Sequence, residues 1–141
     1  MPRVAALLGL LVLFLLAGCS RSGEAVTGNV LAGTTSPYQD YTPEAYQRAL
    51  QEGKIVFLEF HATWCSVCRE QERHLIAAFN ALDDPRIIGF RVNYDRELGL
   101  RREFDVPYQH THVILDQGKN VRFKSSNLLY KDQILAELNK L

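Results

Sequence analysis

Two cysteines that directly follow a short apolar run constrain this chain more than any other feature. The run Ile55–Phe60 has the length and composition of a central strand that is covered on both faces. The segment Trp64–Cys68 comes next, and its two cysteines, Cys65 and Cys68, open a helical pattern that continues to about Ala81. Two thiols at i and i+3 on the first turn of a helix lie on one face. The pattern therefore predicts a buried strand, a tight turn and a helix that begins with two neighbouring thiols.

The first 18 residues have the features of an export signal. Arg3 precedes an almost unbroken apolar run, Val4–Ala17, of about 14 residues, which is shorter than the roughly 20 residues that span a bilayer. It fits the core of a signal peptide, although an uncleaved membrane anchor is the alternative. The segment Leu16–Cys19 resembles the lipobox of bacterial lipoproteins, in which the cysteine is diacylated, for example with palmitate, and becomes the mature N-terminus. The resemblance implies cleavage of residues 1–18 and a lipid on Cys19.

The expected lipid also accounts for the odd number of cysteines. The chain has 3 Cys, and an odd cysteine in an exported protein needs an explanation. If Cys19 carries lipid, Cys65 and Cys68 remain as one pair. We expect an extracytoplasmic protein, periplasmic or on the cell surface, held to a bacterial membrane by its lipid. Disulfides persist in such compartments.

Composition separates a tether from a folded domain. Residues 20–40 are rich in Ser, Gly, Thr and Asn, and such segments bury too little apolar surface to offset the entropy of ordering. We therefore expect the lipidated Cys19 and a flexible tether over residues 19–40, and one domain over residues 41–141. The 16 Lys and Arg residues balance the 16 Asp and Glu residues, so nothing indicates binding to nucleic acid.

Apolar periodicity downstream of residue 41 predicts the order helix, strand, helix, strand, helix, strand, strand, helix. Asp116–Lys119 has the composition of a hairpin turn between the last two strands. The expected strands are 55–60, 87–92, 112–115 and 120–124, and the expected helices are 43–52, 65–81, 96–104 and one capped by Ser126 or Asn127. This order predicts an α/β fold with a central mixed sheet of about four strands and helices on both faces.

The domain resembles the thioredoxin family over residues 41–141. The specific parts are the Trp-Cys-x-x-Cys after a buried strand and the final hairpin with its helix. Cys65 is expected at a helix N-terminus, where unpaired N–H groups favour a thiolate, and we assign it as the nucleophile. Cys68 would resolve the mixed disulfide, and the family gives its two cysteines these roles. The resemblance implies a thiol–disulfide oxidoreductase with no cofactor, whose partners are protein thiols and disulfides and an upstream redox protein.

Two carboxylates are candidates to support the cysteines. Glu59 alternates inward between apolar neighbours, so desolvation should raise its pKa. The family carries an Asp or Glu at this position, which implies a general base for Cys68; a solvent-facing or Arg-paired Glu is the alternative. The segment Cys68–Glu72 is similar to the Cys-Lys-Glu-x-Glu of the C-terminal domain of the membrane thiol–disulfide interchange reductase. That similarity makes Glu72 a possible secondary acid and favours the reducing direction; a solvated surface Glu is the alternative.

Three further residues are candidates for substrate contact. Trp64 is expected either to contact substrate or to pack around the turn. The family usually has a cis-proline loop opposite the cysteines, whereas this chain places His110, followed by Thr111, at that position, and Pro107 comes three residues too early. A cis bond before a residue other than proline costs about 2.5–4 kcal/mol, so His110 is expected after a trans bond. An exposed loop histidine without a role is the alternative.

Other functions remain open at this point. A metal-binding or metal-delivery protein is one alternative, since zinc or copper could bind the two thiolates with His61, His110 or His112. These histidines are spread over different loops, and we assign no metal ligand. A permanent structural disulfide would constrain little chain entropy, because the loop that it closes is short. A binding module of the same fold that has lost turnover is a third possibility.

Overall fold

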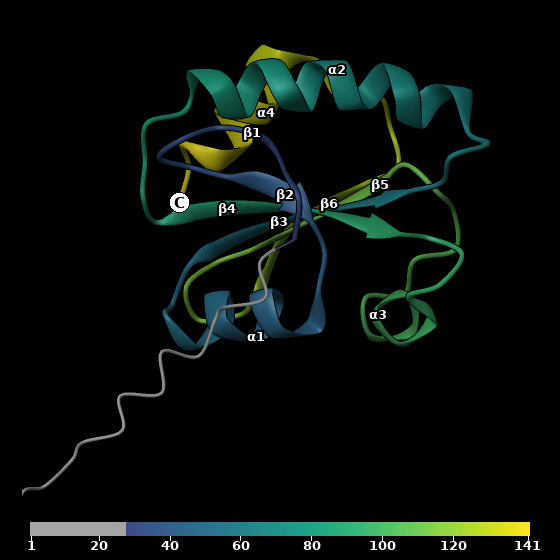
Figure 1. The fold of residues 1–141 in the computed structure, drawn as a ribbon, viewed down its shortest axis with the longest axis horizontal. Helices are drawn as coiled ribbons and strands as arrows, with labels where there is room; N and C mark the ends of the chain where they lie inside the picture. The colour runs from purple at the N-terminus through teal and green to yellow at the C-terminus, as the bar shows by residue number, and fades with distance from the viewer. Residues whose placement is uncertain (1–27) are drawn as a thin grey trace, which may run out of the picture.

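Six strands form one mixed sheet in residues 28–141, the part of the chain that the computed structural model describes (Figure 1). The strand order across the sheet is β1-β2-β4-β3-β5-β6. The strands are β1 (Val30–Ala32), β2 (Tyr38–Asp40), β3 (Ile55–His61), β4 (Ile87–Asn93), β5 (Thr111–Leu115) and β6 (Val121–Ser125). The helices are α1 (Pro43–Gln51), α2 (Ser66–Ala81), α3 (Leu98–Glu103) and α4 (Lys131–Leu138).

Strand β3 lies at the centre of the sheet, and all seven of its residues are buried. It runs parallel to β4 and antiparallel to β5. Helices α2 and α4 cover one face of the sheet, and α1 and α3 cover the other (Figure 1). Alternation along β3 sends Phe57 into the core beneath α2 and α4 and Leu58 into the core on the opposite face. This double burial explains why the strand is mostly apolar in sequence, with Glu59 as the exception within the run Ile55–Phe60.

The predicted order of eight elements downstream of residue 41 is confirmed, from α1 to α4. Thr42 caps α1 by accepting a hydrogen bond from the Ala45 N–H at 3.1 Å. Gly53 follows the helix in the left-handed region, with φ +64°, the conformation in which a glycine commonly ends a helix. No helix within residues 28–141 is long and apolar enough to cross a membrane.

The predicted tether is wrong for the part of it that the structure describes. Residues 30–32 and 38–40 form β1 and β2, which raises the sheet from about four strands to six. Strand β2 pairs in parallel with β4, and the fully buried Tyr38 stacks on Phe79 with ring centroids 5.3 Å apart. One core aromatic and main-chain pairing therefore order a segment whose composition is typical of a linker. The expected signal peptide, residues 1–18, and Cys19 lie outside the described residues.

The start of the last helix also differs from the prediction. Its first residue is Lys131, several positions after Ser126 and Asn127. The Gln71 side chain of α2 holds the segment that precedes α4 through the main chain of Leu129. The Gln71 Nε2–H donates to the Leu129 carbonyl at 2.9 Å, and the Gln71 Oε1 accepts the Leu129 N–H at 2.7 Å. Leu129 thus contacts the core from an extended segment instead of from the helix.

Gly89 of β4 generates a test of this packing. A Cβ at Gly89 would lie 2.5 Å from Phe79 and 2.9 Å from Tyr38, whereas a Cβ at Gly99 in α3 would meet nothing within 4 Å. Because the buried rings must move, we expect Gly89→Ala to destabilise the fold by about 1–3 kcal/mol. The matched variant Gly99→Ala should be neutral or slightly stabilising. Urea unfolding measures both, and equal midpoints for the two variants would contradict the packing described.

Candidate active site

Three connections meet at one edge of the sheet. Strands β3 and β4 are parallel and end there, and the antiparallel β5 begins there. Cys65 follows β3, Asp95 follows β4, and His110 precedes β5. The His110 N–H donates to the Phe60 carbonyl at 2.7 Å, which fixes the last connection to the end of β3. The predicted nucleophile and the predicted loop residue are therefore brought to the same edge.

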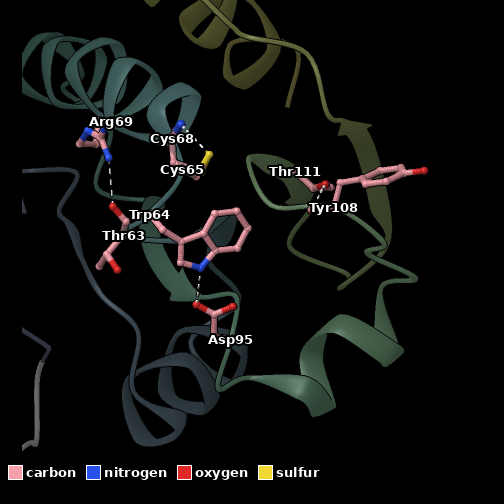
Figure 2. The surroundings of a disulfide bond; sticks show 8 residues. All are labelled: Thr63, Trp64, Cys65, Cys68, Arg69, Asp95, Tyr108 and Thr111. Atoms are coloured by element: carbon pink, nitrogen blue, oxygen red, sulfur yellow. Dashed lines mark hydrogen bonds between the residues drawn. A yellow bond between two sulfur atoms is a disulfide. The ribbon is translucent and has the colours of Figure 1, made fainter.

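Cys65 and Cys68 form a disulfide at the start of α2, with Cα atoms 5.3 Å apart (Figure 2). Cys65 is the N-cap residue, and its Sγ accepts the Cys68 N–H at 3.0 Å. Such N–H groups and the helix dipole stabilise a thiolate at this position. Cys65 is 5% exposed and Cys68 is fully buried. The sulfur that an incoming disulfide can reach is therefore that of Cys65, in agreement with its assignment as the nucleophile.

Exposed apolar side chains lie beside the disulfide. Trp64 is 60% exposed, and its indole Nε1–H donates to Asp95 Oδ2 at 3.0 Å (Figure 2). Val67, between the two cysteines, is also exposed. Of the two roles expected for Trp64, surface contact fits this exposure better than packing does. The bond to Asp95 holds the indole in place without covering it.

The loop before β5 has the trans peptide bond expected at His110 but does not offer the substrate contact expected of Thr111. Every peptide bond in residues 28–141 is trans, including the one before His110, whose φ is +53°. His110 is partly exposed. Thr111 is fully buried, and its hydroxyl lies 2.6 Å from the Tyr108 carbonyl, to which it donates, and 2.8 Å from Ser126 Oγ. It has no surface for the substrate contact expected of it and instead anchors the loop.

Glu59 lies fully buried in the middle of β3 and faces α2. The Tyr38 hydroxyl of β2 donates a hydrogen bond to its Oε2, while its Oε1 has no partner among the described residues. Burial raises the pKa of Glu59 to about 8, with a further rise from the Glu72 carboxylate, against the lowering effects of the Tyr38 hydrogen bond and of Arg91. The predicted inward orientation and raised pKa are confirmed, and Glu59 carries a proton at neutral pH.

A row of polar side chains crosses the sheet through Glu59. Its neighbour on β4 is Arg91, whose own neighbour on β2 is Asp40. Its neighbour on β5 is His112. Burial lowers the pKa of His112 to about 3, with a smaller contribution from His110. His112 is therefore neutral at neutral pH, so the two most deeply buried members of the row, Glu59 and His112, are both uncharged.

Glu72 does not approach the cysteines as a free acid. Its carboxylate pairs with the Arg91 guanidinium, and the Arg91 Nε–H donates to Asp40 Oδ1 at 2.8 Å. The surface alternative was also wrong, because this pair is partly buried. Glu72 acts on the site at a distance, since its charge raises the pKa of Glu59.

Sequence reasoning missed Tyr38, Arg91 and Asp95. Arg91 could have been predicted, because it is a charged residue within a mostly apolar strand and pairs in register with Glu59. Tyr38 was missed because it lies in the segment predicted to be a tether. Asp95 was missed because its contact with Trp64 joins two loops that no local sequence pattern connects.

Only one of the three candidate histidines lies with the thiols. Within the described part of the chain, Cys65, Cys68 and His110 are the one group of three or more His, Cys, Asp or Glu side chains with the spacing of a metal site. His61 and His112 do not belong to this group.

The raised pKa of Glu59 predicts a pH dependence of stability. Between pH 4.5, its ordinary pKa, and about pH 8 the folded protein holds a proton that the unfolded chain has lost. Stability from this group is therefore fully present below pH 4.5 and is lost as pH rises through 8, by up to about 1.4 kcal/mol per pH unit. Chemical unfolding of the oxidised protein should show this fall, and Glu59→Gln should abolish it. Glu103→Gln, at an exposed position, is the control; parallel curves for native protein and Glu59→Gln would refute the assignment.

Comparisons with known proteins agree with this geometry. The sequence profile of the family described as Thioredoxin matches residues 38–140. Thioredoxin H-type of Fagopyrum esculentum is 27% identical over 99 residues, which are 67% of this chain and 84% of that protein. Protein disulfide-isomerase A4 of Bos taurus is 32% identical over 88 residues, 61% of this chain but only 13% of that much longer protein.

A solved structure gives the same result in three dimensions. Trxlp from Edwardsiella tarda EIB202 is 29% identical to this chain, with a TM-score of 0.58 over 65% of this chain and 89% of that one. The matched region contains the disulfide pair at the start of α2, which is the reactive group of a thiol–disulfide oxidoreductase. The profile match covers well over half of the sequence, and the chain therefore belongs to the thioredoxin family.

Proposed function

We propose that this protein is an exported, lipid-anchored thiol–disulfide oxidoreductase that reduces disulfides of other proteins. The observation that carries the redox role is the cysteine pair itself: the slightly exposed Cys65 caps α2, and the buried Cys68 follows it by one turn. The apolar surface of Trp64 and Val67 beside Cys65 suits an extended polypeptide as substrate. The segment after Cys68, similar to that of the interchange reductase, supports the reducing direction.

In this mechanism the dithiol form starts the cycle. The Cys65 thiolate attacks one sulfur of a substrate disulfide, which forms a mixed disulfide and releases the other substrate sulfur as a thiolate. Glu59, which is protonated at rest, first loses its proton and then accepts the proton of the Cys68 thiol. The Cys68 thiolate attacks Cys65 Sγ and releases the second substrate sulfur, and the two substrate thiolates take protons from solvent to give a dithiol. Two electrons have moved to the substrate, and an upstream reductant returns the Cys65–Cys68 disulfide to the dithiol. A pKa of about 8 suits Glu59 for gaining and losing one proton near neutral pH.

The proposed location depends on the start of the chain. Arg3, the apolar run Val4–Ala17 and the lipobox-like Leu16–Cys19 support export and attachment of lipid to Cys19. Two or more acyl chains give stable membrane attachment, where one chain is marginal. The proposed substrates are therefore proteins that present disulfides at the outer side of a bacterial membrane.

Mixed-disulfide trapping tests the enzyme proposal. Cys68→Ala leaves Cys65 able to attack but removes the thiol that resolves the complex, so covalent adducts sensitive to reductant should accumulate in cells. Cys65→Ser with Cys68 intact is the matched control and should trap none. In the insulin assay with dithiothreitol, the native protein should accelerate precipitation and Cys65→Ser should not. Equal rates for the two proteins would contradict the enzyme proposal.

Metabolic labelling tests the anchor. With an alkyne analogue of palmitate, the full chain produced in a bacterium should carry the label and sediment with membranes. Cys19→Ser should lose the label, whereas Cys65→Ser should keep it, because only Cys19 lies in the lipobox-like segment. Label retained by Cys19→Ser would refute the assignment of the lipid.

A further inference from the structure

The two active thiols and one imidazole form a compact donor set. The sulfurs of Cys65 and Cys68 and a ring nitrogen of His110 all lie within 4.8 Å of one another. Tetrahedral zinc with bonds of about 2.3 Å to sulfur and about 2.0–2.1 Å to nitrogen places its ligand atoms about 3.5–3.8 Å apart. Breaking the disulfide removes the bond that holds the two sulfurs together, and small side-chain rotations suffice to reach this spacing.

His110 is held rigidly at this position. Its N–H is bound to the Phe60 carbonyl at 2.7 Å, its φ of +53° lies in the left-handed region, and the next residue, Thr111, is tied to Tyr108 and Ser126. A residue other than glycine in this conformation persists only where the surrounding structure enforces it. The loop therefore presents the imidazole to the cysteines in one fixed backbone geometry.

The His110 ring also lacks the hydrogen bond that a buried nitrogen normally makes. Its Nδ1 is inaccessible to solvent and has no partner in residues 28–141. Buried polar atoms without a partner are uncommon, and a bound ion can supply the missing partner. The imidazole is thus held beside two sulfurs with an unused nitrogen.

The electrostatics favour a cation once the pair is reduced. The Cys68 N–H points at Cys65 Sγ, and the start of α2 stabilises thiolates. Two thiolates and a neutral imidazole are ligands that zinc prefers. The arginine of the polar row, Arg91, is already neutralised by Asp40 and Glu72.

We propose that the reduced protein binds Zn²⁺ through Cys65, Cys68 and His110. Binding replaces two thiol protons: the two thiols, the neutral imidazole and Zn²⁺ give the complex and two protons. A fourth position is left for water or for a ligand from another molecule, which makes the ion exchangeable. Transfer of two electrons from the thiolates to a substrate disulfide restores the Cys65–Cys68 disulfide and frees the ion, so bound zinc and the disulfide exclude each other. This requires only that the pair can be reduced, not the export or anchoring proposed above.

Zinc titration of the full chain, purified in detergent, tests the site. Reduced protein should take one equivalent of Zn²⁺ from a chromogenic chelator, and oxidised protein none. Co²⁺ in its place should give the visible bands of tetrahedral cobalt and a near-ultraviolet thiolate charge-transfer band. The double variant with Cys65→Ser and Cys68→Ser keeps Cys19 and should lose both signals. Binding of equal strength by this variant would overturn the proposal.

A second comparison isolates the histidine. Asn tolerates the left-handed backbone conformation and is a poor zinc ligand, so His110→Asn should keep the fold and weaken zinc binding at least tenfold. His74→Ala on α2 is the matched control and should bind as the native protein does. Unchanged affinity in His110→Asn would overturn the three-ligand site.

Insulin reduction by the same preparations separates this inference from the proposed function. Turnover by the native protein without zinc uptake would refute the zinc site alone. Zinc uptake without turnover would refute the reductase alone.

Discussion

Burial of β3 on both faces is the constraint on which the active site depends. The strand has neighbours on both sides and helices above and below, so its end is fixed in space. Cys65 begins α2 four residues after that end, and the His110 N–H is bound to the Phe60 carbonyl of the same strand. The nucleophile and the loop that faces it are therefore both held in position by the same rigid strand, β3. Sites that need sub-ångström precision are generally supported in this way.

The same burial would make unpaired charges costly in the row of polar side chains that crosses the sheet through Glu59. A buried charge without a partner is costly. Arg91 is paired with Asp40 and Glu72, while Glu59 and His112 avoid charge altogether because burial moves their pKa values in opposite directions. The pKa of Glu59 lies near neutrality mainly because Glu59 is buried deep in the sheet. The Glu72 carboxylate raises this pKa further, and the Arg91 guanidinium lowers it.

Local sequence patterns were enough to predict most of the fold and the central residues of the active site. The apolar run, the cysteine spacing and the helical periodicity placed β3, Cys65 and Glu59 correctly, because each depends on neighbours within a few positions. Strands β1 and β2 are three residues long, too short to show a period; β2 forms because β4 offers it a partner, and β1 pairs in turn with β2. The start of α4 was misplaced because Gln71, 58 positions away, holds Leu129. Tyr38 and His112 join the site only through strand register, which no local pattern encodes.

The first two strands change what counts as the minimal folding unit. A version that begins at residue 41 would leave the long edge of β4 without its partner, and unpaired edges of this kind recruit other chains and aggregate. It would also remove the phenol that donates to Glu59. Soluble versions of the domain should therefore keep the chain from residue 28 onward, where the first hydrogen bonds to β2 are made.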